Sequence, residues 1–280
     1  MPVLHRISKR RPGGDGKGSD AAKGKIGSPG IFEQQEALTA AYQARLNEAA
    51  RLSDRAVLLS RQAGLRERAA QFEGARAVWS ALFGLREEGQ RNAASALALH
   101  QSRDADYGPA FALAILHQSA QTHEIVVDLE KRYPQDTSVQ FSYLPALRAL
   151  EALNQGDAAK ALEMTQVATP YDLAVPGTAF YAGSFFGAMY PVYVRGLAYS
   201  RLGRHREAAT EFQKILDHPG IVLNDPIGPM ARLQLARASF ASGDRAKSAA
   251  AYKDLFALWK DADPDVPVVQ QAKAEFARLP

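Results

Sequence analysis

From residue 32 onward, apolar side chains recur three and four positions apart along the chain. The segment 197–216 illustrates this spacing, with apolar side chains at Leu197, Ala198, Leu202, Phe212 and Ile215. Such spacing places apolar groups on one face of an α-helix. Alternating runs of β-branched residues, which would indicate strands, are nearly absent. The pattern therefore predicts an all-α fold.

The predicted helices come in pairs that repeat along the chain. Glycines at 203 and 243 separate the two helices of the two clearest pairs. The expected pairs are 34–45 with 48–63, 68–86 with 90–101, 107–118 with 121–132, 140–154 with 157–167, 191–202 with 207–217, and 229–242 with 245–259. A last helix is expected at 268–279, capping the end of the array. Tandem helical hairpins at this period predict a solenoid over residues 32–280.

One hairpin resembles the tetratricopeptide repeat, a helix–turn–helix unit of about 34 residues. Gly196, Tyr199, Ala208 and Phe212 stand at the spacing of that repeat's signature positions. The small residues let two helices approach, and the aromatic rings fill the space beside them. The last pair departs from this pattern, with these residues at the same places: Ala236, Ser239, Ser248 and Tyr252. The resemblance implies a right-handed superhelix of stacked hairpins.

A second resemblance covers most of residues 32–279. Five strings are similar to the C-terminal repeat region of large bacterial serine/threonine protein kinases: FEQQ (32–35), RYPQDTSVQ (132–140), YPVYVRGLAY (190–199), EFQKILDHPGIVLNDPIG (211–228) and LWKDADPDVP (258–267). In that family the kinase domain precedes the repeats. The chain has no HRD-x-x-x-x-N loop, DFG motif or Gly-rich loop, so the resemblance implies a sensor or docking segment without catalysis. Residues 1–31 depart from the family, which leaves open a truncated gene, a wrongly assigned start or a stand-alone protein.

The charge of the chain is unevenly distributed. The whole chain has 34 Lys and Arg against 30 Asp and Glu, but residues 1–31 alone hold seven Lys and Arg against two Asp. This Gly- and Lys-rich segment has few apolar side chains, so we expect a disordered basic tail. The remainder is nearly neutral, which argues against a nucleic-acid-binding face. No run of 18 apolar residues occurs, so no membrane span is expected. We expect a cytoplasmic location, and a periplasmic one stays open.

The residues offer little catalytic or metal-binding chemistry. The chain has no cysteine, and its six histidines form no H-E-x-x-H or i, i+4 pair. Asp261, Asp263 and Asp265 have the start of a calcium-loop spacing but lack its glycine and glutamate, so we expect them to form a turn, with one or two of them capping the last helix. An aromatic segment at 169–190 lacks the G-x-S-x-G elbow of a hydrolase. Its rings either pack on a neighbouring hairpin or form an adhesive rim, and packing is favoured. We expect no enzyme activity, no cofactor and no metal.

The candidate binding surface follows from the solenoid. The first helix of each hairpin lines the inner, concave face, where aromatic and arginine side chains suit a peptide or a partner domain. This reasoning selects Tyr190, Tyr193, Leu197, Arg201, Leu233 and Arg237 as partner-binding residues. The alternative is that they only stack one hairpin on the next. The first hypothesis for function is a non-catalytic protein-interaction scaffold. The second is a detached regulatory arm of a bacterial serine/threonine kinase system, and the oligomeric state stays open.

Overall fold

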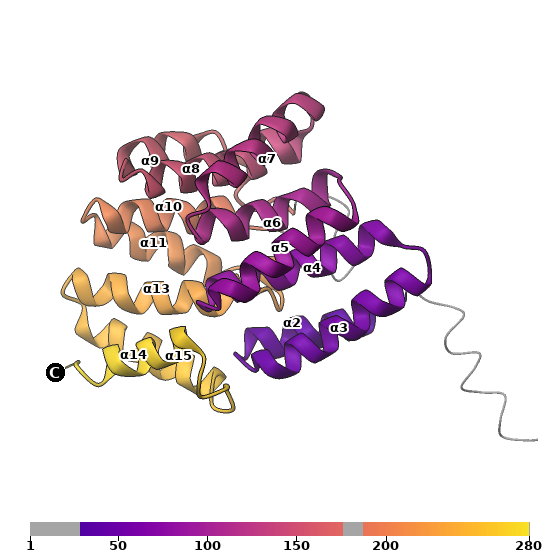
Figure 1. Ribbon diagram of the computed structural model, residues 1–280. Coiled ribbons are helices and arrows are strands. Elements are labelled where there is room, and N and C mark those ends of the chain that lie inside the picture. Colours follow the sequence, from indigo (N-terminus) through magenta and orange to yellow (C-terminus); the bar gives the residue numbers. More distant parts are fainter. Residues whose placement is uncertain (1–28, 176–186, 280) are drawn as a thin grey trace, which may run out of the picture.

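The computed structural model describes residues 29–175 and 187–279, and this part of the chain is helical without a strand (Figure 1). Most of the helices form antiparallel pairs, here numbered 1 to 6. The pairs are α2 (Ile31–Tyr42) with α3 (Leu46–Gln62), α4 (Arg66–Leu82) with α5 (Arg86–Leu99), α6 (Arg103–Ile115) with α7 (Ser119–Arg132), α8 (Leu144–Asn154) with α9 (Ala158–Gln166), α10 (Tyr190–Arg201) with α11 (His205–Leu216), and α13 (Ile227–Ala241) with α14 (Arg245–Leu258). All six predicted pairs are confirmed. The predicted tail up to residue 28 and the aromatic residues 176–186 lie outside the described part.

Four shorter elements complete the array. These are η1 (Val139–Tyr143), η2 (Thr169–Tyr171), α12 (Pro219–Val222) and the final helix α15 (Pro267–Phe276). The helix predicted at 140–154 begins as the π-turn η1 and continues as α8. Pro145, near the junction, has no backbone N–H to donate, so the regular ladder is interrupted there.

The turn inside every pair contains one residue with a left-handed backbone. These residues are Ala44, Gly84, His117, Gly156, Gly203 and Gly243. At Gly203 the chain reverses, and the N–H of Arg204 donates to the carbonyl oxygen of Tyr199 at 2.9 Å. Glycine adopts a positive φ without the steric cost of a Cβ atom, which explains why four of the six positions are glycine.

Within a pair, small residues allow the two helices to approach closely. A Cβ atom built on Gly196 of α10 would lie 2.6 Å from the ring of Phe212 on α11. Phe212 and Ala208 are fully buried at this crossing. The predicted role of Gly196 in the close approach of these two helices is therefore confirmed.

The interior of the array is filled with apolar and aromatic side chains. One continuous core extends from α2 to α15. At its centre the rings of Tyr107 and Tyr143 stack at 3.8 Å between centroids, and Phe111 meets Tyr190 edge-on at 4.6 Å. All four side chains are buried. The hairpins thus wrap around a packed interior.

The two ends of the array meet. In Figure 1, α14 and α15 lie at the same level as α2 and α3, after the chain has passed over the top through α7 to α9. Trp259, which follows α14, donates from Nε1 to the carbonyl oxygen of Tyr42 at 3.2 Å. The N–H of Val268 in α15 donates to the carbonyl oxygen of Phe83 at 3.3 Å. The final helix therefore contacts pair 2 as well as packing on α14.

Asp263 completes this closure and corrects one prediction. Its carboxylate accepts a hydrogen bond from the N–H of Asn47 at 2.8 Å, and its own N–H donates to the carbonyl oxygen of Ala44 at 3.0 Å. The sequence predicted that the aspartates of 261–265 form a turn or cap the last helix; Asp261 and Asp265 do lie in turns, but no side chain caps α15. Asp263 instead satisfies a free N–H in the first turn of α3, more than 200 residues earlier in the chain.

Candidate functional site

Three of the six predicted partner-binding residues lie in the core. Tyr190 is fully buried, Tyr193 is 3% exposed and Leu233 is 1% exposed. Tyr193 packs edge-on against Phe212 at 5.7 Å between ring centroids. The prediction that these three side chains line an open binding face is wrong. The reason is that the array curves far enough for its first helices to pack against one another.

The other three predicted residues have different surroundings. Leu197 is half-buried and packs against the core. Arg237 forms a bidentate ion pair with Glu275 of α15, with both N–O distances at 2.9 Å. Glu275 also accepts a hydrogen bond from the hydroxyl of Tyr252. Arg237 therefore ties α13 to the final helix. Only Arg201 is exposed, and it lines a surface groove described below.

A buried carboxyl group near Tyr190 escaped the sequence reasoning. Oδ1 of Asp225 accepts hydrogen bonds from the hydroxyl of Tyr190 at 2.8 Å and from the N–H of Ile227 at 2.9 Å. Burial raises the pKa of Asp225 to about 6, although these two hydrogen bonds act in the opposite direction. Asp225 lines none of the five surface pockets with volumes of about 140–510 Å³ in the described part of the chain, and both of its hydrogen bonds are internal, so we assign it a structural role.

Asp225→Asn tests whether the buried, ionised carboxylate of Asp225 destabilises the folded chain. Because the folded-state pKa lies above the value of an unfolded chain, stability is lost as pH rises from about 4 through 6. The free energy of unfolding of the variant, relative to that of the unmodified protein, should therefore be about 2–3 kcal/mol more favourable at pH 7.5 than at pH 4. Urea denaturation at the two pH values measures this change. An equal difference between the two proteins at both pH values would contradict it.

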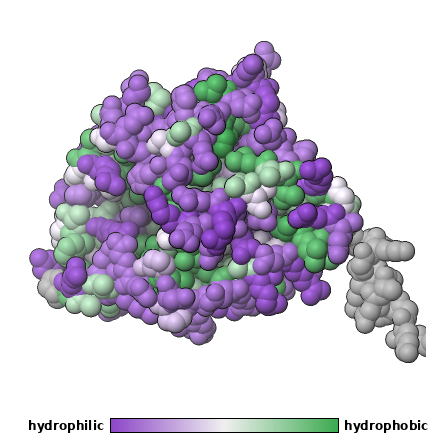
Figure 2. Space-filling model, viewed as in Figure 1, coloured by the Kyte–Doolittle hydropathy of each residue, from purple (hydrophilic) through white to green (hydrophobic). Residues whose placement is uncertain are grey.

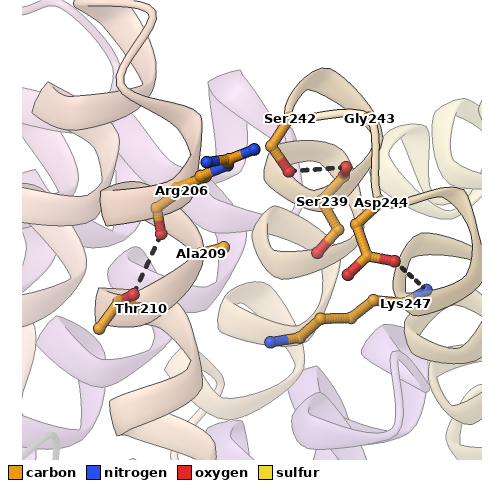
Figure 3. A pocket seen from close by; sticks show the side chains of 8 residues that line it. All are labelled: Arg206, Ala209, Thr210, Ser239, Ser242, Gly243, Asp244 and Lys247. Atoms are coloured by element: carbon orange, nitrogen blue, oxygen red, sulfur yellow. Dashed lines mark hydrogen bonds between the residues drawn. The ribbon is translucent and has the colours of Figure 1, made fainter.

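A surface groove lies between pairs 5 and 6. We call it groove 1; it has a volume of about 440 Å³. One wall is the start of α11 and the other is the α13–α14 turn (Figure 3). Its lining residues are Arg206, Ala209, Thr210, Ser239, Ser242, Gly243, Asp244 and Lys247.

Groove 1 has a small residue where pair 5 has an aromatic one. Ser239 stands in pair 6 at the place that Tyr199 takes in pair 5. The Tyr199 ring is half-buried and lies beneath the guanidinium of Arg204, 4.6 Å from the ring centroid. Pair 6 has no ring at this position. Ser239 is 1% exposed, and its hydroxyl has no hydrogen-bond partner in the structure.

A second groove, groove 2, lies between pairs 4 and 5 and has a volume of about 400 Å³. It is lined by the α8–α9 turn and by Arg201 and Leu202 at the end of α10. Both grooves border the α10–α11 turn, so they follow one another along the edge formed by the hairpin turns of pairs 4 to 6. We call this region the turn edge.

In the view of Figure 2 the molecular surface is mostly hydrophilic, with apolar side chains in separate small patches.

The groove residues do not form a recognisable catalytic arrangement. No histidine lines groove 1, and the Ser239 hydroxyl forms no hydrogen bond to a base that would activate it as a nucleophile. Over residues 29–175 and 187–279, no three His, Asp or Glu side chains converge as a metal-binding set. Groove 1 offers instead hydrogen-bond donors and two cationic side chains.

Comparison with known proteins assigns no family. No protein-family model matches the chain, and no curated protein matches it. Both the tetratricopeptide assignment and the kinase association therefore stay predictions. None of the helices in the described ranges has the length and apolar character needed to cross a bilayer.

Proposed function

We propose that the protein is a non-catalytic protein-interaction scaffold that binds an extended peptide segment of a partner along the turn edge. The observation that carries this proposal is groove 1, a side-chain-sized hollow with an unpartnered buried hydroxyl at Ser239. Buried hydroxyl groups in proteins nearly always have a hydrogen-bond partner, and a bound segment would supply one.

The succession of the two grooves supports an extended ligand. They lie one hairpin apart along the turn edge. An extended chain advances about 3.3 Å per residue, so a short segment can reach from one groove to the next. Groove 2 would take the second side chain, next to Arg201 and Leu202.

We further propose that the hairpins are tetratricopeptide-like and follow a right-handed superhelix. The close crossing at Gly196 and Phe212 and the glycine-containing turns support this assignment. The packed interior moves the proposed binding surface from the predicted concave face to the turn edge. A scaffold of this kind works through a rigid frame, and the contacts between its two ends provide that rigidity.

Ser239→Tyr tests the proposed function. The added ring should occupy groove 1 as Tyr199 occupies the equivalent place in pair 5. We expect a random dodecapeptide phage library, selected on the full chain, to yield peptides that bind the unmodified protein. Filling the groove should weaken their binding about tenfold or more, since a side chain excluded from its pocket loses its contacts. Fluorescence anisotropy with the synthetic peptides measures the affinity.

Ser239→Ala is the matched control, because it keeps the hollow and removes only one hydroxyl. It should weaken binding only by the loss of one hydrogen bond, and so less than Ser239→Tyr does, and the melting temperature of both variants shows that they are folded. The proposed function would be wrong if no peptide were enriched over an unrelated helical protein. It would also be wrong if the selected peptides bound Ser239→Tyr as tightly as the unmodified chain.

A further inference from the structure

We propose that groove 1 recognises an acidic peptide, whose Asp or Glu carboxylates pair with Arg206 and Lys247. This inference rests on the proposed scaffold function and adds the chemical class of the partner. Its first support is the local charge. The turns at 201–206 and 242–247 carry five Lys and Arg and one acidic residue, Asp244, whereas residues 32–280 as a whole are nearly neutral. A local excess of positive charge attracts a segment of opposite charge.

The second support is the direction of the two cationic side chains. In Figure 3, Arg206 extends from α11 toward the α13–α14 turn, and Lys247 extends from the first turn of α14 toward α11. The two side chains therefore approach the groove from opposite walls. Their charged ends lie apart in this view, so a peptide that crosses the groove could place one carboxylate on the guanidinium and another on the ammonium.

Both cations are free to bind. Two nearby basic groups already have carboxylate partners: Arg204 pairs with Glu207 at 2.9 Å, and Lys214 pairs with Asp172 at 2.8 Å. Within the described part of the chain, neither Arg206 nor Lys247 takes part in an ion pair. A ligand carboxylate would not have to displace an internal partner.

The third support is Ser239, which lines the groove. Its hydroxyl is buried and unpartnered, and a hydroxyl can donate a hydrogen bond to a carboxylate oxygen. Thr210, on the opposite wall, already donates its hydroxyl to the carbonyl oxygen of Arg206 at 3.1 Å. Ser239 is therefore the neutral donor that groove 1 leaves unused.

Asp244 opposes the binding of an anion and provides a test. Its carboxylate accepts from the N–H of Lys247 at 3.0 Å and so caps α14, but its charge also reduces the positive potential of the groove. Asparagine caps a helix about as well as aspartate, so Asp244→Asn removes the charge and keeps the cap.

A nucleic acid, with its regularly spaced phosphates, fits this surface less well than an acidic peptide does. Nucleic-acid binding draws on a stripe of many phosphate contacts, whereas the positive charge here is confined to two turns around a side-chain-sized hollow. The structure therefore favours a peptide with one or a few carboxylates.

The test uses the full chain and the dodecapeptide library. We expect the selected peptides to be rich in Asp and Glu and their binding to weaken as salt is raised. The double variant R206E/K247E should bind them about tenfold more weakly or worse, since each reversal replaces an attraction by a repulsion. Asp244→Asn should bind them a few-fold more tightly. Replacing Asp and Glu by Asn and Gln in the peptides should also remove binding.

R86E/K131E is the control, because it makes the same change in net charge at two exposed positions outside the turn edge. It should leave the affinity unchanged. The selected peptides could instead be neutral or basic, with affinities that R206E/K247E does not change. That result would overturn the acidic-ligand inference and leave the scaffold function standing. A library that yields no binder would overturn both. A third outcome would also overturn the inference. In it, the chain binds poly-uridine RNA or phosphatidylserine vesicles but no acidic peptide, and R206E/K247E removes that binding.

Discussion

Arg195→Ala is expected to lower the free energy of unfolding by about 3–5 kcal/mol, one of the largest effects of any single substitution in this chain. Arg195 of α10 is buried, and its guanidinium bonds Asp172 at 2.6 and 3.2 Å and Glu211 at 2.7 Å. Burial alone would lower the pKa of Arg195, but the bonds to Glu211 and Asp172 more than compensate and raise it. Removing the cation leaves the carboxylate of Asp172, which is 2% exposed, with Lys214 as its remaining partner.

Chemical denaturation of three variants measures how much the Arg195 ion pairs contribute to the free energy of unfolding, compared with an exposed arginine. Arg201→Ala removes an exposed arginine from the same helix and should change stability by less than about 0.5 kcal/mol. The double variant Arg195→Ala/Asp172→Ala removes the buried Asp172 carboxylate together with the guanidinium, so only the less buried Glu211 carboxylate loses its partner. Its loss should therefore be smaller than the sum of the two single losses. Additive losses, or an Arg195→Ala loss below about 1 kcal/mol, would show that the ion pair contributes little.

Trp259→Ala is expected to cost about 3–5 kcal/mol and to loosen the contact between the two ends of the array. Trp259 is 3% exposed, its ring lies 5.7 Å from that of Phe83, and its Nε1 bonds the carbonyl oxygen of Tyr42. It therefore joins the end of pair 6 to pairs 1 and 2. Its loss leaves a cavity and removes a hydrogen bond at the same place.

The absence of cysteine from the sequence allows a direct measurement of this contact. Spin labels on Arg51→Cys and Lys253→Cys, both exposed positions on α3 and α14, report the distance between the first and last pairs. Trp259→Ala should lengthen or broaden that distance. Trp79→Ala, which removes an equally buried ring from α4, should cost similar stability and leave the distance unchanged. An unchanged distance in Trp259→Ala would mean that the other closure contacts suffice.

The binding proposals have a structural consequence. Groove 1 lies between pairs 5 and 6, and Trp259 directly follows the second helix of pair 6. The closure of the array therefore stabilises the position of one wall of the groove. A ligand that binds groove 1 meets a surface that is already ordered, which reduces the entropic cost of binding.

The local features of this protein could be predicted from its sequence. Helical periodicity located all six pairs, and glycines located the turns of the two clearest pairs, because both depend on interactions within a few residues. The close crossing at Gly196 and Phe212 was also predictable, since the two residues lie on consecutive helices of one hairpin.

Long-range contacts were decided only by the tertiary structure. The sequence placed Tyr190, Tyr193 and Leu233 on an open face, because their helical positions face inward whether the array is open or closed. The curvature that buries them is the sum of small rotations between successive hairpins, which local spacing does not specify. The same reason hid the contacts of Asp263 with Ala44 and Asn47 across the closure. The sequence by itself determined the helices and their pairing, and the accumulated packing angles decided which faces remain exposed to a partner.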